Sequence, residues 1–116
     1  MRPYEITKVD GAAITLHDLL DGHTTVVHDS KRSARVFVGD AVVARVAPVG
    51  ISGLPAISGG FFPMEGETPA MLRSMLLEGL AARRRQHPRT TMTAYLKTMA
   101  PAFHLSWWAT RLQTRR

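Results

Sequence analysis

The chain has 116 residues, contains no cysteine and carries a formal net charge of +6. A chain of this length forms one domain and can bury roughly two-thirds of the surface that its unfolded state exposes. The missing cysteines exclude disulfides, cysteine-ligated zinc, iron–sulfur clusters and thiol nucleophiles. No apolar run reaches the ~20 residues that span a bilayer, and the N-terminus lacks a signal-peptide core, so we expect a cytoplasmic protein with no membrane partner.

The positive charge is concentrated in the C-terminal half of the chain. Residues 1–66 hold six basic and seven acidic side chains, a net charge of −1, whereas residues 67–116 hold nine basic and two acidic ones, a net charge of +7. A basic surface over the whole fold would need an excess of basic over acidic side chains in both halves. We therefore expect a near-neutral body with a basic extension.

The first half of the chain alternates β-branched and polar residues in short runs, which is typical of strands. Strands are predicted over residues 4–9, 12–20 and 23–29, and a further strand within residues 36–50 after a bend at Gly39 and Asp40. The polar residues 29–35 break the alternation, so they form a loop or a single helical turn. The glycine-rich residues 49–66 fit one more short, irregular strand.

Asp21 and Gly22 predict the turn of the first hairpin. Asp-Gly between two alternating runs favours a two-residue type I′ turn, whose central residues need positive φ. Counting outward from this turn pairs Leu16 with Val27 and His17 with Val26. One face of the hairpin is then apolar and consists of Ile14, Leu16, Leu20 and Val27. In the later strand, Val42, Ala44 and Val46 are expected on one side, opposite Val43 and Arg45.

The second half of the chain changes to a helical period. A helix is predicted from Pro69, with Thr68 as its N-cap, to the segment before Pro88. Its apolar residues form a stripe that is expected to pack on the strands: Met71, Leu72, Met75, Leu76 and Leu80. A second helix is predicted from Thr90 or Thr91, and a third over residues 102–112. The second helix carries Met92, Tyr95, Leu96 and Met99 on one face.

These elements predict an α+β fold. Four or five short strands with closely spaced turns indicate a small closed barrel of the OB or SH3-like kind over residues 1–66. Two or three C-terminal helices over residues 67–116 form a basic extension that packs on the barrel, and the two parts together form a single structural unit.

Four arginines near the end of the first predicted helix are the sharpest functional signal: Arg83, Arg84, Arg85 and Arg89. Cations at a helix C-terminus complement the helix dipole, which accounts for one or two of them. The guanidinium is planar and permanently charged, so it suits phosphate recognition. The cluster predicts a phosphate-binding surface, and a solubilising face is the alternative.

A smaller basic group lies in the polar segment after the first hairpin: Lys31, Arg32 and Arg35. These side chains suit a second phosphate contact. Asp29 and Asp40 partly neutralise the group, so an ordinary solvated loop is the alternative.

Two histidines of the hairpin, His17 and His28, are candidate metal ligands. In the predicted register His17 and His28 are diagonal neighbours on one face, roughly 7 Å apart. A transition-metal site needs three or four protein ligands. Asp18 and Asp29 point to the opposite face, so we expect solvent-facing residues and no metal site.

The C-terminal aromatic residues predict an interface: Phe103, Trp107 and Trp108. Adjacent residues on a helix point about 100° apart, so one tryptophan is expected in the core and the other at an interface. Stacking on an unpaired base and insertion at a membrane surface are the alternatives.

The chain shows none of the motifs of common enzymes. It has no paired-glutamate motif, nucleophile elbow, HExxH helix or Rossmann fingerprint, and residues 58–64 lack the Gly-Lys-Ser/Thr of a phosphate loop. We therefore expect a protein that is not an enzyme and uses no cofactor.

A third of the chain, residues 14–50, carries a run of spaced small motifs. They are Leu16-x-Asp18-Leu19-x-x-Gly22, Val27-x-Asp29, Ser33-Ala34, Gly39-Asp40 and Ala44-Arg45-Val46-x-Pro48. This pattern resembles uncharacterised bacterial proteins, some of which also carry a SEC-C zinc motif. The resemblance implies a compact β module in a bacterial protein. SEC-C supplies cysteine ligands, which this chain lacks, so the resemblance implies no metal site here.

The function predicted from these features is nucleic-acid binding by the basic helical extension, with Lys31, Arg32 and Arg35 as a second contact. The alternative is an interaction or assembly module that binds a protein partner or a second copy of the chain. Methionine and tryptophan in the C-terminal half favour such an interface, because one adapts in shape and the other contributes large area.

Overall fold

The computed structural model describes residues 1–64 and 66–99 of the chain. Its elements, in chain order, are β1 (Arg2–Asp10), β2 (Ala13–Asp18), β3 (Thr24–His28), α1 (Ser30–Ser33), β4 (Ala41–Val49), β5 (Leu54–Pro63) and α2 (Pro69–Gln86). Residues 92–99 form a further helix. The single turn of α1 and the start of α2 at Pro69 confirm the predictions for these segments.

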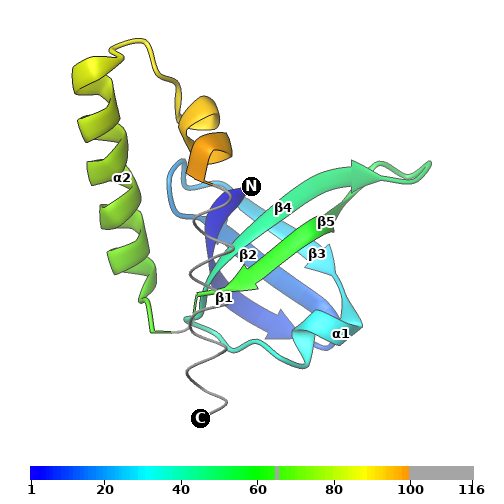
Figure 1. Cartoon of the computed structure of the whole chain (residues 1–116). Coiled ribbons are helices and arrows are strands. Elements are labelled where there is room, and N and C mark those ends of the chain that lie inside the picture. Colours follow the sequence, from blue (N-terminus) through cyan, green and yellow to red (C-terminus); the bar gives the residue numbers. More distant parts are fainter. Residues whose placement is uncertain (65, 100–116) are drawn as a thin grey trace.

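The five strands form one antiparallel sheet in the order β3-β2-β1-β4-β5 (Figure 1). The first three strands are sequential neighbours, and β4 returns to lie beside β1, which is the arrangement of a Greek key. The predicted α+β class is confirmed.

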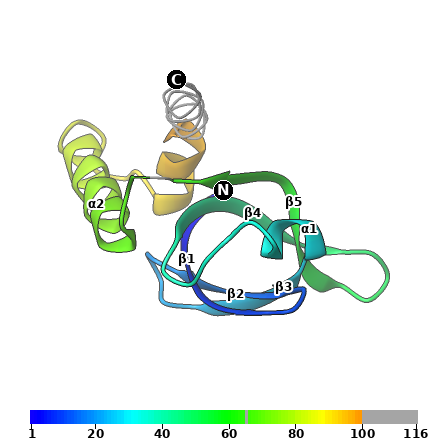
Figure 2. The same ribbon diagram turned by 90° about the horizontal axis from the view of Figure 1, so that it is seen from below.

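The sheet curls so that its two edge strands, β3 and β5, approach each other (Figure 2). Within the described residues no hydrogen-bonded ladder joins these two strands, so the predicted closed barrel is wrong. The reason lies in β5, which pairs with β4 out to Val49 and Leu54 and so follows β4 away from the body into a projecting hairpin.

The inside of the curl is filled by the apolar residues of the alternating strands. The buried cluster consists of Tyr4, Ile6, Ile14, Leu16, Val27, Val36, Val42 and Ala44. Successive side chains of a strand point to opposite faces, so the period of two in the sequence becomes one buried face. The predicted shared face of Ile14, Leu16 and Val27 is confirmed.

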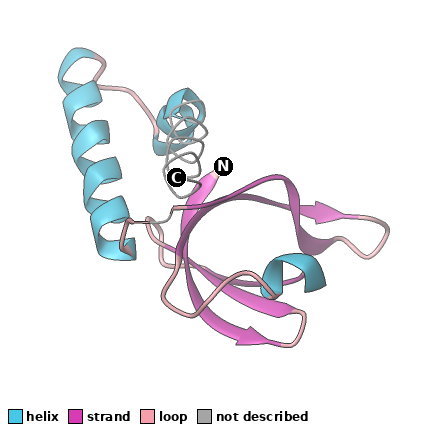
Figure 3. Ribbon diagram, turned by 60° about the horizontal axis from the view of Figure 1, so that its bottom comes forward, coloured by secondary structure: helices cyan, strands magenta, loops and turns pink. Residues whose placement is uncertain are grey.

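The outside of the sheet carries a second core, against which the helices pack on one side of the sheet (Figure 3). This cluster consists of Leu19, Ala41, Val43, Met64, Leu72, Leu76, Leu80, Tyr95 and Leu96. Val42 and Val43 therefore belong to different cores, as their predicted opposite sides require. Residues 41–44 of β4 are buried on both faces of the sheet and join the two cores.

The first hairpin has a different register from the predicted one. Ile14 pairs with Val27 and Leu16 with Thr25, a shift of two residues, because the loop is longer than two residues. Asp18 causes the longer loop: its carboxylate accepts hydrogen bonds from the backbone N–H groups of Leu20 and Asp21, at 2.8 and 3.1 Å. A shift of two preserves the faces of the strands. Leu20, however, packs against the outer core and not beside Ile14.

The stripe predicted on α2 is narrower than expected. Leu72, Leu76 and Leu80 are buried against the sheet, whereas Met71 and Met75 are 54% and 44% exposed. Each methionine precedes a buried leucine by one residue and so lies about 100° around the helix. The predicted packing is confirmed for the three leucines and wrong for the two methionines.

The predicted second helix is confirmed: residues 92–99 are helical and pack beside α2. Thr91 caps this second helix, accepting a hydrogen bond at its hydroxyl oxygen from the backbone N–H of Ala94 at 3.1 Å. Tyr95 and Leu96 are buried in the outer core, and Met92 and Met99 pack against it. The third predicted helix, residues 102–112, lies outside the described residues.

None of the helices in the described part of the chain is long and apolar enough to cross a membrane.

Candidate functional site

The arginines predicted to bind phosphate lie at the end of α2 and in the turn that follows it. Arg83, Arg84 and Arg85 occupy the last turn of the helix, and Arg89 follows it; all four side chains are exposed. Within residues 1–64 and 66–99, no carboxylate forms an ion pair with any of them. We call these four residues the arginine cluster. Its charge is available to a ligand.

The backbone that carries the arginine cluster is fixed by hydrogen bonds. The His87 N–H donates to the Arg83 carbonyl at 2.9 Å, and the Thr90 N–H donates to the His87 carbonyl at 3.0 Å. The Arg84 Nε donates to the Thr90 carbonyl at 3.0 Å, which ties the helix to the turn. Residues 86–90, which include Arg89 of the cluster, line an open hollow of about 510 Å³. The cluster therefore presents its cations from a defined surface.

The second basic group lies on α1 and just after it. Asp29 caps α1, and its carboxylate binds Arg32 twice: it accepts from the backbone N–H at 3.0 Å and from the guanidinium at 2.6 Å. Burial of Asp29 opposes its ionisation, but these hydrogen bonds and the charge of Arg32 prevail and hold the pKa of Asp29 below its ordinary value. Arg32 is thus partly neutralised, while Lys31 and Arg35 are exposed.

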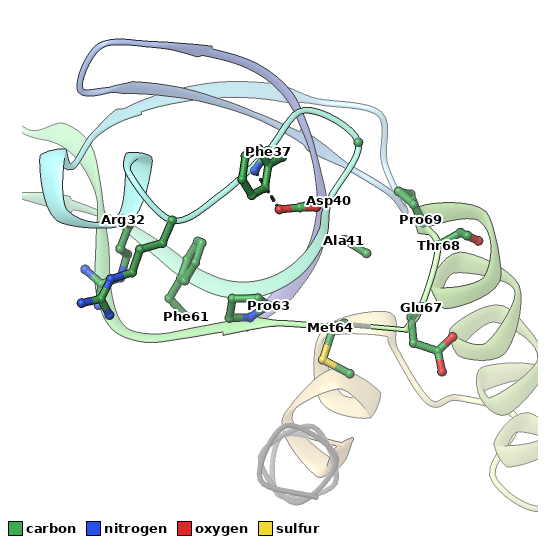
Figure 4. A pocket seen from close by; sticks show the side chains of 12 residues that line it. Arg32, Phe37, Asp40, Ala41, Phe61, Pro63, Met64, Glu67, Thr68 and Pro69 are labelled. Carbon is green, nitrogen blue, oxygen red and sulfur yellow. Dashed lines mark hydrogen bonds between the residues drawn. The ribbon is translucent and has the colours of Figure 1, made fainter. Parts of the chain in front are cut away.

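A pocket of about 660 Å³ opens beside α1 (Figure 4). Arg32 and Arg35 line it together with two phenylalanines, Phe37 and Phe61, and Lys31 does not. The Arg32 guanidinium lies 5.5 Å from the centre of the Phe61 ring, within the range of a cation–π contact. The sequence reasoning missed both phenylalanines. The sequence signal that could have indicated Phe37 is the pair of apolar residues, Phe37 and Val38, directly before the turn at Gly39.

The structure does not bring the two basic groups together. Figures 1 and 2 place α1 and the end of α2 on opposite sides of the molecule. The arginine cluster and the residues of α1 therefore form two separate surfaces.

The predicted approach of His17 and His28 is wrong. His17 lies opposite Thr24 and His28 lies opposite Ala13, so the histidines are four positions apart along the hairpin, about 13 Å. In the described part of the chain, no group of three or more His, Asp or Glu side chains is arranged to bind a metal ion.

The predicted interface residues Phe103, Trp107 and Trp108 lie outside the described residues. Their role stays a prediction.

Comparison with known proteins gives no family for this chain. No family model, no curated protein and no solved structure matches it significantly. The resemblance of residues 14–50 to a bacterial β module therefore stays a prediction.

Proposed function

We propose that this protein binds nucleic acid without catalysing a reaction, and that the arginine cluster contacts the phosphates. The observation that carries the proposal is the state of Arg83, Arg84, Arg85 and Arg89: all four are exposed, and no described carboxylate pairs with them. Helix-dipole complementation is worth a few tenths of a kcal/mol per exposed cation and accounts for one or two of these arginines. A polyanion accounts for all four.

The fold supports a nucleic-acid ligand. The OB fold is a five-stranded, partly open Greek-key barrel that binds oligonucleotides. The strand number, the Greek-key order and the open edge between β3 and β5 favour this kind of barrel over an SH3-like one. OB folds bind through strands 2 and 3 and the loops between strands 1 and 2 and between strands 4 and 5.

The outward face of β2 and β3 differs from a phosphate-binding surface. It consists of Ala13, Thr15, His17, Thr24, Val26 and His28, none of which carries a permanent positive charge. In our proposal the phosphate contacts therefore come from α2, and the barrel serves to position the helix.

Two single substitutions test where the binding lies. Arg85→Gln and Lys8→Gln each remove one exposed positive charge, the first from the arginine cluster and the second from β1. We expect Arg85→Gln to weaken binding of a labelled single-stranded oligonucleotide at low salt by severalfold, and Lys8→Gln to change it little, because counterion release depends on direct phosphate contacts. Equal effects of the two substitutions would reject the cluster as the binding surface.

A charge-conserving variant distinguishes charge from fold. Replacing all four residues of the arginine cluster by lysine retains the charge, whereas replacing all four by glutamine removes it. We expect the lysine variant to keep most of the affinity and the glutamine variant to lose it, with both retaining the circular dichroism spectrum of the parent, because the four side chains are exposed.

A second candidate function is assembly with a protein partner or a second copy of the chain. The observation that favours it is apolar exposure: Met71 and Met75 are exposed on α2, and Ile51 and Leu54 are exposed at the tip of the β4–β5 hairpin. Flexible methionine side chains are favoured at adaptable binding surfaces.

The mass in solution tests the assembly candidate. If α2 forms an interface between copies, the parent chain sediments as an oligomer, and the double variant Met71→Gln, Met75→Gln shifts it toward the monomer. A monomeric parent at high concentration would remove self-association from consideration.

A further inference from the structure

The pocket beside α1 contains an aromatic ring that no packing requirement explains. Phe37 is 73% exposed, although a phenylalanine side chain normally contributes to a core or an interface. It lies in the connection between α1 and β4 and lines the pocket of about 660 Å³ (Figure 4).

The exposed position of Phe37 is fixed by its backbone. Its N–H donates to the Asp40 carboxylate at 2.8 Å, and the Asp40 N–H donates to the Phe37 carbonyl at 3.0 Å. The turn is then joined to β1, because the Gly39 N–H donates to the Ile6 carbonyl at 2.7 Å and the Ile6 N–H donates to the Asp40 carbonyl at 2.9 Å. Gly39 has a φ of 96°, a conformation that favours glycine. The ring is thus presented from a pinned turn.

The basic and acidic side chains that line the pocket lie in different parts of it. Arg32 and Phe61 lie at one end, and Glu67 lies at the other, as Figure 4 shows. Arg35 adds a second guanidinium to the lining, and no described carboxylate pairs with it. Arginine forks bind phosphate oxygens, so an anionic group of a ligand is favoured at the arginines. Away from the arginines the lining is acidic: the Asp40 carboxylate, which accepts from the Phe37 N–H, lies beside the ring, and Glu67 lies at the far end, so a neutral group with N–H donors is favoured there.

A nucleotide has this distribution of chemistry. Its phosphate is an anion, its base has a flat face that stacks on an aromatic ring, and adenine, guanine and cytosine carry exocyclic amino donors. We propose that this pocket binds one unpaired nucleotide, with the base stacked on Phe37 and the phosphate at Arg32 and Arg35. The inference rests on residues other than the arginine cluster and extends the proposed function from phosphate binding to base contact.

The test is a titration of the full chain with AMP, followed by NMR through the ring protons of Phe37 and Phe61. These reporters separate binding in the pocket from phosphate bound at the end of α2. Phe37→Ala should weaken AMP binding at least about fivefold, the lower range for removing an aromatic stacking partner. Phe37→Trp should retain it.

Val38→Ala is the matched control, because Val38 is 65% exposed in the same turn and does not line the pocket. It should leave AMP binding unchanged. Phe37 is exposed, so its replacement is expected to leave the fold intact, and thermal unfolding checks this. Equal effects of Phe37→Ala and Val38→Ala would overturn the proposal while leaving the arginine cluster untested by this experiment.

Two further ligands separate the base from the phosphate. Adenosine should bind more weakly than AMP, and this preference should become smaller in Arg35→Gln, which leaves Arg32 as the only arginine among the described residues of the pocket lining. Ribose 5-phosphate should bind more weakly than AMP in the parent; equal binding would exclude base stacking and overturn the proposal.

A short oligo(dA) distinguishes a free nucleotide from one in a strand. If the pocket receives a base of a strand, Phe37→Ala should weaken the binding of oligo(dA) and of AMP to a similar extent. If Phe37→Ala weakens the binding of AMP alone, the pocket binds a free nucleotide. Either outcome supports the proposal that the pocket binds a nucleotide, and the proposal is overturned if neither ligand perturbs the ring signals of Phe37 and Phe61.

Discussion

Asp29 shows how one side chain orders a functional segment. It caps α1 with one carboxylate oxygen and binds the Arg32 guanidinium with the other, at 2.6 Å. That contact holds Arg32 beside the Phe61 ring and at the mouth of the pocket. The carboxylate thus stabilises the helix and positions a residue of the candidate site.

Asp29→Asn should destabilise the protein in a pH-dependent way. Asparagine caps a helix about as well as aspartate, so the substitution removes the ion pair and retains the cap. The native pKa of Asp29 is lowered, so its stabilisation is present above the ordinary aspartate pKa of about 4 and is lost as the pH falls through the lower native value. We expect the parent to be more stable by less than about 1 kcal/mol at neutral pH, since Arg32 is partly exposed.

Urea unfolding of the parent and Asp29→Asn between pH 7 and pH 3 measures this difference. It should shrink below a pH of about 4. A difference that stays constant or grows on acidification would show that the ion pair contributes nothing. Asp29→Ala should add a pH-independent loss of about 1 kcal/mol, because it also removes the cap.

Asp18 explains why the first hairpin could be predicted in its faces but not in its register. The alternation of Ile14 and Leu16 is a property of the strand itself and is visible in the sequence. The loop length depends on the Asp18 side chain, which is 3% exposed and accepts two backbone N–H groups of the loop. The same carboxylate binds the Arg2 guanidinium, and this hydrogen bond raises the pKa of Arg2. Such a contact between distant segments leaves no periodic signal.

Within α2 the apolar residues divide into a buried line and an exposed pair. Leu72, Leu76 and Leu80 follow one another at intervals of four and face the sheet, whereas Met71 and Met75 face outward. The spacing of apolar residues in the sequence predicts which side of a helix is buried. The width of the buried face, however, depends on how much of α2 is covered by the neighbouring residues 92–99. That packing was therefore predictable for the leucines and not for the methionines.

Leu76→Ala and Met75→Ala form a matched pair for this division. Leu76 is fully buried, so its truncation should cost about 2–5 kcal/mol of unfolding free energy. Met75 is partly exposed, so its truncation should cost less than about 1 kcal/mol. Urea denaturation measures both. Similar losses at the two positions would contradict the packing of α2 described above.

Gly79 couples α2 to the helix of residues 92–99. Glycine inside a helix costs about 1 kcal/mol relative to alanine, so it needs a packing reason. The Tyr95 hydroxyl occupies the place that a Cβ at residue 79 would take. Gly79→Ala should therefore destabilise the protein despite its better helix propensity.

A double-mutant cycle with Tyr95→Phe tests this coupling. Removing the hydroxyl relieves the closest contact, so the double variant should be more stable than the sum of the two single effects predicts. Additive effects, or a stabilising Gly79→Ala, would show that Tyr95 does not restrict residue 79.

At the scale of the molecule, two cores share strand β4 and hold the helices against the outside of a curled sheet. This arrangement separates the arginine cluster from the pocket beside α1 (Figures 1 and 2). The arginines themselves could be found from the sequence, because four cations within seven residues exceed what a helix end needs. The pocket could not, because Phe37, Phe61 and Glu67 lie on three different segments that only the fold brings together.

The central claim is that the arginine cluster, whose exposed side chains pair with no carboxylate of the described residues, binds the phosphates of a nucleic acid. The most direct test is the affinity of the full chain for a single-stranded oligonucleotide as a function of salt. Four phosphate contacts predict a slope of log K against log salt of about −3, which corresponds to a loss of about 50-fold between 50 and 200 mM. A slope near zero, or no binding at 50 mM, would contradict it.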